Sequence, residues 1–255
     1  MQSCALCLKE ATLCDSHLLP KATYRLIRKS AAQRPVIMTP KLISAMDLQV
    51  HQHLLCVDCE QRFSRAERYA LSQCCRGNGF CLQALLETLK PLPEATEPLP
   101  YPSVGHDVDI DALVYFSSSL LWRASVAWWR MWDRPFKLDL GPKYQEEFRR
   151  YLRGEIGFPD NAAVWISVTS RKKPELACIG PHLHNKNAYY QYEMQVFGVR
   201  WSMFIGGQID AIVRRMCTLR SPERFIYVSE SVEQMVIRGG GKLIGTARTA
   251  KNVQP

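Results

Sequence analysis

The sequence predicts an α+β protein with a small metal-stapled module at its amino terminus and a larger domain behind it. Two Cys-x2-Cys pairs, Cys4/Cys7 and Cys56/Cys59, lie in the first sixty residues. A proline-rich stretch follows at 91–102, and beyond it apolar residues alternate with period two in several segments. We expect a zinc-binding domain at 1–90, a linker at 91–108, an α+β domain with an antiparallel sheet at 109–237 and a basic flexible tail at 238–255.

Composition limits the classes of protein that this chain can belong to. Of its 255 residues 47 % are hydrophobic, enough for a sizeable core, and the net charge of +9 favours an anionic partner such as nucleic acid. Residues 1–10 lack the features of a secretory signal, and no uncharged apolar run reaches the ~18 residues of a membrane span. Ten cysteines without an export signal favour a reducing compartment. We therefore expect a cytoplasmic protein with no membrane segment.

The second domain should combine helices with strands. Residues 109–132 predict a long helix, because acids stand at its start and large apolar residues follow on nearly every face. Residues 142–153 predict a second helix, which begins with a proline and stops at Gly154. β-Branched and aromatic residues predict strands at 163–169, 189–197, 199–205 and 225–229, with a turn at Gly198 and a short helix at 208–216.

The two cysteine pairs predict one structural zinc site. Two thiolates two residues apart can hold one tetrahedral ion, so two pairs supply its four ligands, Cys4, Cys7, Cys56 and Cys59. A local site of Cys4, Cys7, Cys14 and His17 is the alternative, with Cys74, Cys75 and Cys81 as further thiols for the second pair. The matching spacing of the pairs favours the four-cysteine site. The remaining cysteines are then expected to be buried or free thiols.

The residues around the cysteine pairs resemble a known family. Ser16-His17-Leu-Leu-Pro20 lies between the pairs, and the second pair stands in Leu54-Leu-Cys-x2-Cys-Glu60. A knuckle, a hairpin and a second knuckle that opens a helix form the treble-clef, or ββα-metal, arrangement. The motifs resemble the HNH or His-Me finger endonucleases in their zinc-stapled form, and more narrowly a group of uncharacterised bacterial proteins. The resemblance covers about the first seventy residues.

That resemblance implies a metal-dependent endonuclease that hydrolyses phosphodiester bonds of DNA, of a kind often found in bacterial defence or mobile elements. By position, His17 would be the general base and Glu60 would hold a catalytic Mg²⁺ or Mn²⁺. Glu67 lies on the same helix face as Glu60 and would join it. His51 stands where the family often has an asparagine that orients the base, and it is the third candidate catalytic residue.

The sequence also departs from the family pattern. Ser16 precedes His17 where many members have an acidic or histidine ligand, and Asp15, one residue further back, is expected on the other face of its strand. Four basic side chains are expected to contact phosphates as positioning residues: Lys21, Arg25, Arg62 and Arg65.

Each candidate has a structural alternative. His17 can be a structural histidine beside the zinc, Glu60 an ordinary acid in the first turn of a helix, and His51 a surface residue. The corresponding alternative function is a zinc module that has lost its catalytic metal site and binds nucleic acid or a partner protein. The second domain could also mediate homo-oligomer contacts. The segment 182–185 (His-Leu-His-Asn) is expected to be a loop without a neighbouring carboxylate, and therefore no site.

Overall fold

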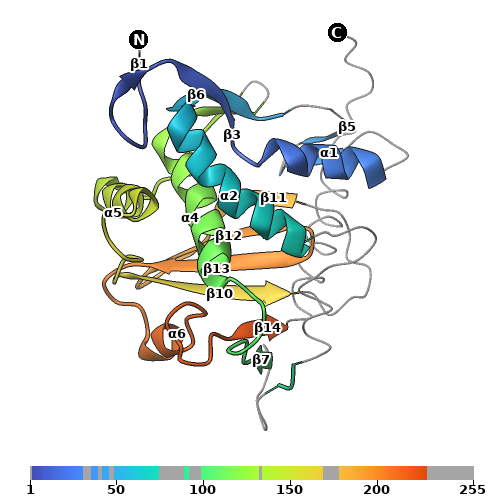
Figure 1. Ribbon diagram of the computed structural model, residues 1–255, viewed down its shortest axis with the longest axis vertical. Coiled ribbons are helices and arrows are strands. Elements are labelled where there is room, and N and C mark those ends of the chain that lie inside the picture. Colours follow the sequence, from blue (N-terminus) through green and yellow to red (C-terminus); the bar gives the residue numbers. More distant parts are fainter. Residues whose placement is uncertain are drawn as a thin grey trace.

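A long helix lies across one face of a six-stranded sheet, a second long helix packs beside the first, and small β-hairpins lie at their upper end (Figure 1). The computed structural model describes residues 2–30, 36–39, 42–45, 49–74, 89–91, 99–131, 134–168 and 178–228. The expected tail at 238–255 lies outside these ranges, as do Cys75 and Cys81. The described part is mixed α+β, as the sequence predicts. Within it, no helix has the length and apolar character needed to cross a membrane.

The amino-terminal region is built from short antiparallel ladders and one long helix. Its outer hairpin pairs β1 (Gln2–Ser3) with β2 (Glu10–Ala11), and its inner hairpin pairs β3 (Leu13–His17) with β6 (His51–Cys56). Helix α2 (Val57–Cys74) begins directly after β6. Between β3 and β6 the chain forms helix α1 (Lys21–Ser30) and a third ladder of β4 (Val36–Thr39) with β5 (Leu42–Ala45).

The large sheet has the strand order β11-β12-β13-β10-β14-β7. Its strands are β7 (Leu99–Tyr101), β10 (Ala162–Val168), β11 (Cys178–Lys186), β12 (Tyr190–Val196), β13 (Val199–Ile205) and β14 (Ile226–Val228). Neighbouring strands run antiparallel except β10 and β14, which are parallel, so the sheet is rich in antiparallel pairs without being purely antiparallel. Strand β7 falls within the proline-rich stretch and lies at the edge of the sheet. Pro100 has no amide hydrogen to donate, and an edge strand tolerates this because it has a neighbour on one side only.

Strand β11 corrects the expectation of a loop at 182–185. Cys178–Lys186 pairs antiparallel with β12, and the ladder has register shifts between Ile179 and His182 and between Leu183 and Asn185. These irregularities explain the missing signal, because a strand with bulges does not keep a strict alternation of polar and apolar residues. The pairing also places Glu193 opposite His182, so a carboxylate does lie beside this segment.

The long helix α4 (Ile110–Val126) is shorter than predicted. It begins where expected, with the side chain of Asp109 accepting a hydrogen bond from the Ala112 amide at 2.8 Å. It ends six residues before Trp132, because the chain turns into β8 (Trp129–Met131), which pairs with β9 (Arg134–Phe136). The indole of Trp129 then packs back on the helix and donates to the Arg123 carbonyl at 2.9 Å. Trp128, which lies between α4 and β8, is 63 % exposed.

The other predicted elements are present. Helix α5 (Pro142–Arg153) has the predicted bounds, and Gly154 closes it in a left-handed conformation with φ 76°. Phe197 and Gly198, with φ of 48° and 81°, form the tight turn between β12 and β13. Helix α6 (Ala211–Arg215) lies within the predicted 208–216 segment.

One continuous core joins the hairpins, the helices and the sheet. Phe63 of α2 packs edge-on against Trp122 of α4, with ring centroids 6.2 Å apart. Phe116 of α4 in turn packs against Trp201 of β13, with centroids 5.5 Å apart. These four rings belong to one buried cluster that also contains Cys4. The hairpin region is therefore held against the helices that cover the sheet.

Candidate metal centre and the adjoining hairpin face

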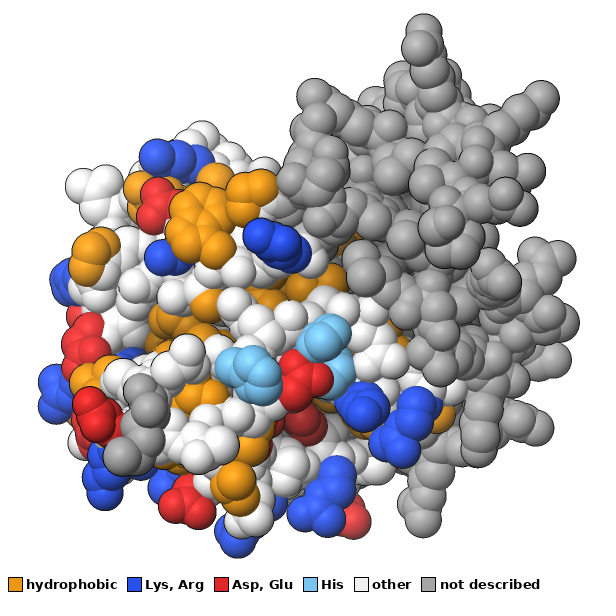
Figure 2. All heavy atoms as spheres, turned by 90° about the horizontal axis from the view of Figure 1, so that it is seen from above, with side chains coloured by type: hydrophobic (Ala, Val, Ile, Leu, Met, Phe, Trp, Pro, Cys, Tyr) orange, Lys and Arg blue, Asp and Glu red, His pale blue; other side chains and the backbone are white. Residues whose placement is uncertain are grey.

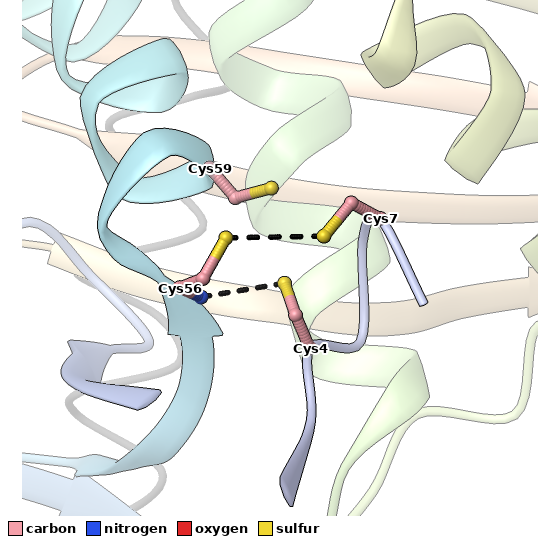
Figure 3. Close-up of side chains that lie close together, drawn as sticks. All are labelled: Cys4, Cys7, Cys56 and Cys59. Atoms are coloured by element: carbon pink, nitrogen blue, oxygen red, sulfur yellow. Dashed lines mark hydrogen bonds between the residues drawn. The ribbon is translucent and has the colours of Figure 1, made fainter. Parts of the chain in front are cut away.

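Four thiols meet where the outer hairpin approaches the start of α2 (Figure 3). Cys4 and Cys7 come from the turn between β1 and β2, Cys56 ends β6 and Cys59 lies in the first turn of α2. Their sulfur atoms all lie within 4.8 Å of one another. Four soft ligands at this spacing can hold one metal ion and are compatible with zinc. The predicted set of four cysteines is thus assembled.

The alternative site of three cysteines and His17 is not assembled. Neither Cys14 nor His17 belongs to a metal-compatible group among the residues that the structure describes. The knuckle itself has the expected tight turn: the Leu8 amide donates to the Cys4 carbonyl at 2.8 Å, and Leu8 has a positive φ of 62°. The backbone therefore aims both thiols of the first pair toward the second pair.

The electrostatics of the thiol cluster favour bound positive charge. Burial opposes ionisation of Cys4, but hydrogen bonds from nearby backbone amides outweigh it and lower its pKa to about 7. One of these donors is the Cys56 amide, 3.3 Å from the sulfur. Burial raises the pKa of Cys59, and the neighbouring thiols raise it further. Without a cation the cluster therefore accommodates one thiolate more easily than four.

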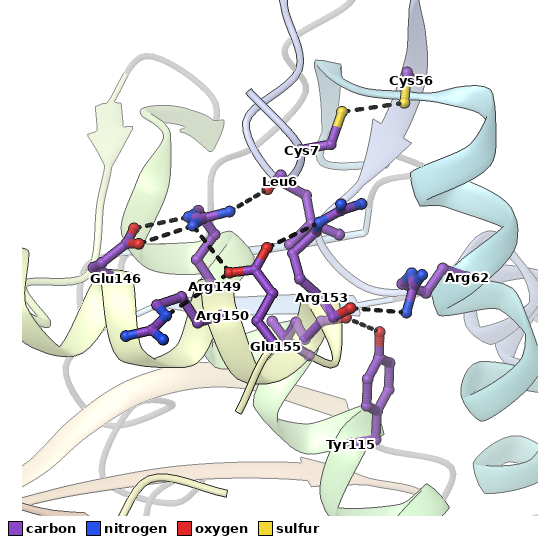
Figure 4. A network of polar contacts seen from close by, with 11 residues as sticks. Leu6, Cys7, Cys56, Arg62, Tyr115, Glu146, Arg149, Arg150, Arg153 and Glu155 are labelled. Carbon is purple, nitrogen blue, oxygen red and sulfur yellow. Dashed lines mark hydrogen bonds and ion pairs between the residues drawn. The ribbon is translucent and has the colours of Figure 1, made fainter. Parts of the chain in front are cut away.

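A polar network holds the first knuckle against the second half of the chain (Figure 4). Arg149 of α5 donates to the Leu6 carbonyl, in the knuckle, at 3.0 Å and also pairs with Glu146 and Glu155. Arg62 of α2 donates to the Arg153 carbonyl at 3.2 Å. One of the four predicted phosphate contacts, Arg62, thus takes part in an internal hydrogen bond.

The opposite end of the inner hairpin carries three histidines. His17 stands across the ladder from His51, and their rings stack with centroids 5.3 Å apart. The Nδ1 atom of His51 lies 2.5 Å from a carboxylate oxygen of Asp15, and Nδ1 of His53 lies 3.2 Å from the Leu13 carbonyl. Figure 2 looks down on this end of the molecule and shows histidine and acidic side chains together on the surface, with lysine and arginine side chains nearby.

Sequence reasoning missed two partners of these histidines. The Nε2 atom of His17 lies 2.8 Å from the amide oxygen of Gln49, and the carboxylate of Asp15 lies 2.5 Å from Nδ1 of His51. Ser16 is buried and Asp15 is exposed, so Asp15 lies on the other face of β3 from Ser16, as expected, and shares its face with His17. The same period of two would have placed Gln49 beside His51.

Glu60 lies half-buried on the side of α2 that faces β3. Burial raises its pKa, while a hydrogen bond with the Ser16 hydroxyl and the charges of Arg123 and His17 act in the opposite direction. That hydroxyl also accepts from the Leu55 amide at 3.2 Å. The Oε1 atom of Glu60 is buried and has no hydrogen-bond partner among the described residues. A buried carboxylate oxygen without a donor is costly unless a cation or water meets it.

Glu67 is placed differently from Glu60. Its carboxylate forms an ion pair with Arg123, a side chain of α4 that is only 1 % exposed. The same guanidinium donates to the His17 carbonyl at 2.8 Å and lies over the Phe63 ring, 5.2 Å from its centroid. Arg123 thus ties the end of β3 to both long helices, and one oxygen of Glu67 is engaged in that contact. The remaining predicted phosphate contacts are exposed: Lys21, Arg25 and Arg65.

Comparisons with known proteins do not assign a family. Neither the protein-family models nor the curated proteins nor the solved structures gave a match. The resemblance to the HNH endonucleases therefore stays a prediction from the motifs.

Proposed function

We propose that the amino-terminal region is a zinc-stapled treble clef of the His-Me finger type and that the protein is a metal-dependent endonuclease acting on DNA. The order of elements supports the fold: a knuckle, the β3–β6 hairpin, and a helix whose first turn carries Cys59. Zinc is the ion proposed for the four cysteines, because closed tetrahedral thiolate sites are its common structural use.

The observation that carries the proposed function is the buried carboxylate oxygen of Glu60 beneath β3, near the end of the hairpin that carries His17. The charge of His17 is close enough to act on the pKa of Glu60, and the Oε1 atom of Glu60 has no partner among the described residues. A carboxylate oxygen without a hydrogen-bond partner is a suitable ligand for a hard divalent cation such as Mg²⁺ or Mn²⁺. When bound, the cation would supply charge stabilisation at the phosphate and the leaving oxygen.

The histidine is set up to accept a proton. With the amide oxygen of Gln49 as acceptor, Nε2 of His17 carries the hydrogen and Nδ1 keeps its lone pair. The stacked ring of His51 and the Arg123 bond to the His17 carbonyl limit the motion of the residue. His17 is then the general base that deprotonates the attacking water. His51, bonded to Asp15, supports the ring of His17 in this scheme.

Charge supports a nucleic-acid substrate. The chain has a net charge of +9. Lys21 and Arg25 are exposed on α1, the helix that comes next after β3 in the chain. Cationic side chains next to the hairpin end would contact phosphates without reading base sequence.

The second candidate function is a zinc-stapled module that binds nucleic acid or a partner protein without cutting. One observation favours it: Glu67 and His51 already have partners in Arg123 and Asp15. Glu60 is then the predicted catalytic-metal ligand with a buried oxygen that has no partner among the described residues. Salt-sensitive DNA binding without cleavage in Mg²⁺ or Mn²⁺ is the signature of this alternative.

The test is nicking of supercoiled plasmid DNA with added Mg²⁺ or Mn²⁺. Replacing a general base typically costs ~10²–10⁴-fold, so His17→Ala should lose nicking by that factor while its zinc content stays unchanged. His106→Ala is the matched control, because His106 is an exposed histidine far along the chain from the hairpin. Glu60→Gln should nick more slowly and should need a higher concentration of the added cation, because a ligand of that cation is lost. Unchanged nicking in His17→Ala would remove the proposed mechanism.

A further inference from the structure

A second group of metal-compatible side chains lies on the large sheet, outside the hairpin region. His182 and His184 of β11 and Glu193 of β12 each offer one ligand atom, and these atoms lie within 4.8 Å of one another. His182 pairs directly with Glu193 across the ladder, so their side chains leave the same face of the sheet. None of these three residues has a part in the endonuclease proposed above.

The bulge in β11 brings the second histidine to the group. The register shifts by one residue between Leu183 and Asn185, which leaves His184 without a ladder partner. Such an extra residue redirects its side chain and is frequent next to functional sites. The Nδ1 atom of His184 consequently lies 3.5 Å from the Oε2 atom of Glu193.

The hydrogen bonds around the group match those of metal ligands. Nδ1 of His182 lies 3.2 Å from the Gly180 carbonyl, so a hydrogen on Nδ1 leaves Nε2 free as a ligand atom. Histidines that bind metals usually donate their other ring nitrogen in this way, which fixes the tautomer and the ring orientation.

The carboxylate is also held in place from behind. The side chain of Glu193 is 3 % exposed, and Arg200 forms an ion pair with its Oε1 atom. Gln191 donates to the same oxygen at 2.8 Å. These contacts occupy Oε1 and leave Oε2 directed toward His184. The ion pair with Arg200 explains why a carboxylate can be buried here, but it does not require two imidazoles to converge on that carboxylate.

We propose that His182, His184 and Glu193 bind a divalent transition-metal ion. Two imidazole nitrogens and one carboxylate oxygen form a ligand set used by zinc and by non-haem iron, and three protein ligands leave further positions open to water or a small molecule. This site has three ligands instead of four, and the positive charge of Arg200 lies beside one of them. It should therefore bind its ion more weakly, and exchange it more readily, than the site of four cysteines.

Cobalt(II) distinguishes the two centres spectroscopically. Zinc-loaded protein is dialysed against Co²⁺ in the presence of excess Mg²⁺. The Mg²⁺ occupies sites made of oxygen ligands but competes poorly for imidazole nitrogens, so it does not displace cobalt from the histidines. Wild type should bind a further equivalent of cobalt whose visible spectrum lacks the thiolate charge-transfer band that cobalt on cysteines gives. Mutation of a residue that only hydrogen-bonds to a metal ligand typically lowers metal affinity by ~10–100-fold. His182→Ala and His184→Ala each remove a ligand, so each should lower the affinity for cobalt by more than that.

The controls separate a lost ligand from a lost fold. His184 is exposed, so His184→Ala should unfold at the wild-type temperature when no cobalt is present. His106→Ala should bind cobalt like wild type. No cobalt uptake beyond the cysteine site in wild type would overturn the proposal, as would equal uptake in a variant that lacks both His182 and His184. Plasmid nicking has no part in this readout, so the endonuclease and the second metal site can fail independently.

Discussion

The two ends of the β3–β6 hairpin carry polar clusters of opposite character. At one end, next to Leu13 and Cys56, four thiols point at a common centre and need only an ion to complete it. At the other end, His17 and His51 are bonded to protein side chains, and a single oxygen of Glu60 is left without a partner. Structural metal sites are closed and catalytic sites keep open positions. The difference matches the proposed roles, in which the cysteine end (the closed end) holds the fold and the histidine end (the open end) carries the chemistry.

The largest effect is expected from breaking the closed end. Cys59→Ser should release the metal ion and unfold the hairpin region, because structural zinc contributes ~10–16 kcal/mol in small zinc modules, as much as a whole domain's stability. Zinc content by mass spectrometry and limited proteolysis of the hairpin region measure this loss.

Cys14→Ser is the matched control for the closed end. Cys14 is half-buried on β3, beside the cluster but outside it, so its variant should keep both zinc and protease resistance. A Cys59→Ser protein that retains a full equivalent of zinc would show that the cluster is not the structural centre.

The second effect concerns the arginine that joins the hairpin to the long helices. Arg123→Met should destabilise the protein by about 3 kcal/mol, because Glu67 would lose the partner of a largely buried charge. The lower end of the usual range applies, since the Glu67 side chain is 15 % exposed and water can reach it. Urea unfolding followed by circular dichroism gives the free energy.

The double variant Arg123→Met/Glu67→Leu sharpens this prediction. If the cost comes from the stranded carboxylate, removing that carboxylate should restore most of the lost stability. If the double variant is as unstable as Arg123→Met, the lost stability comes instead from the hydrogen bonds that Arg123 makes to the His17 carbonyl and to Ser119. Arg68→Met, an exposed arginine on α2, should change stability by less than ~0.5 kcal/mol.

The third effect follows from the proposed endonuclease activity and concerns the open end. Gln49→Ala should slow nicking by ~10–100-fold, the usual cost of losing a residue that orients a functional histidine. Gln61→Ala, on an exposed position of α2, is the control and should cut like wild type. An unchanged rate of nicking in Gln49→Ala would contradict the positioning role.

The closed end was predictable from sequence, whereas the open end was predictable only in part. The members of each Cys-x2-Cys pair are neighbours in the chain, so their geometry is local and the spacing alone indicates it. The partners of the histidines and of Glu67 come from distant segments: Gln49 lies 32 residues from His17, and Arg123 lies 56 residues from Glu67. Such contacts depend on how helices and strands pack, so local patterns do not specify the partner across them.

The same contrast holds for the fold. Helix α5 was predicted to the residue, because its proline start and glycine stop are local signals. The end of α4 and the strand β11 were missed, because the fold of Trp129 back onto α4 and the bulges in β11 arise from tertiary pairing.

The smallest effect should come from the exposed pair of Asp15 and His51. Burial opposes ionisation of Asp15, but its bond to His51 and the charges of the three histidines together outweigh it and lower its pKa. A lowered pKa in the folded state stabilises the protein above the ordinary pKa of an aspartate, about 3.9, and this stabilisation is lost as the pH falls through the lowered value. Both side chains are 50 % exposed, so screening limits the contribution to ~0.2–1 kcal/mol.

His51→Ala should therefore be slightly less stable than wild type at pH 6, and the difference should be smaller at pH 3, closer to the lowered pKa of Asp15. Urea unfolding at the two pH values measures it. His53→Ala is the matched control, because His53 bonds to the Leu13 carbonyl and acts on Asp15 only through its charge. A His51→Ala variant that loses several kcal/mol at pH 6 would show that the open end also holds the fold, and the contrast between the two ends of the hairpin would fail.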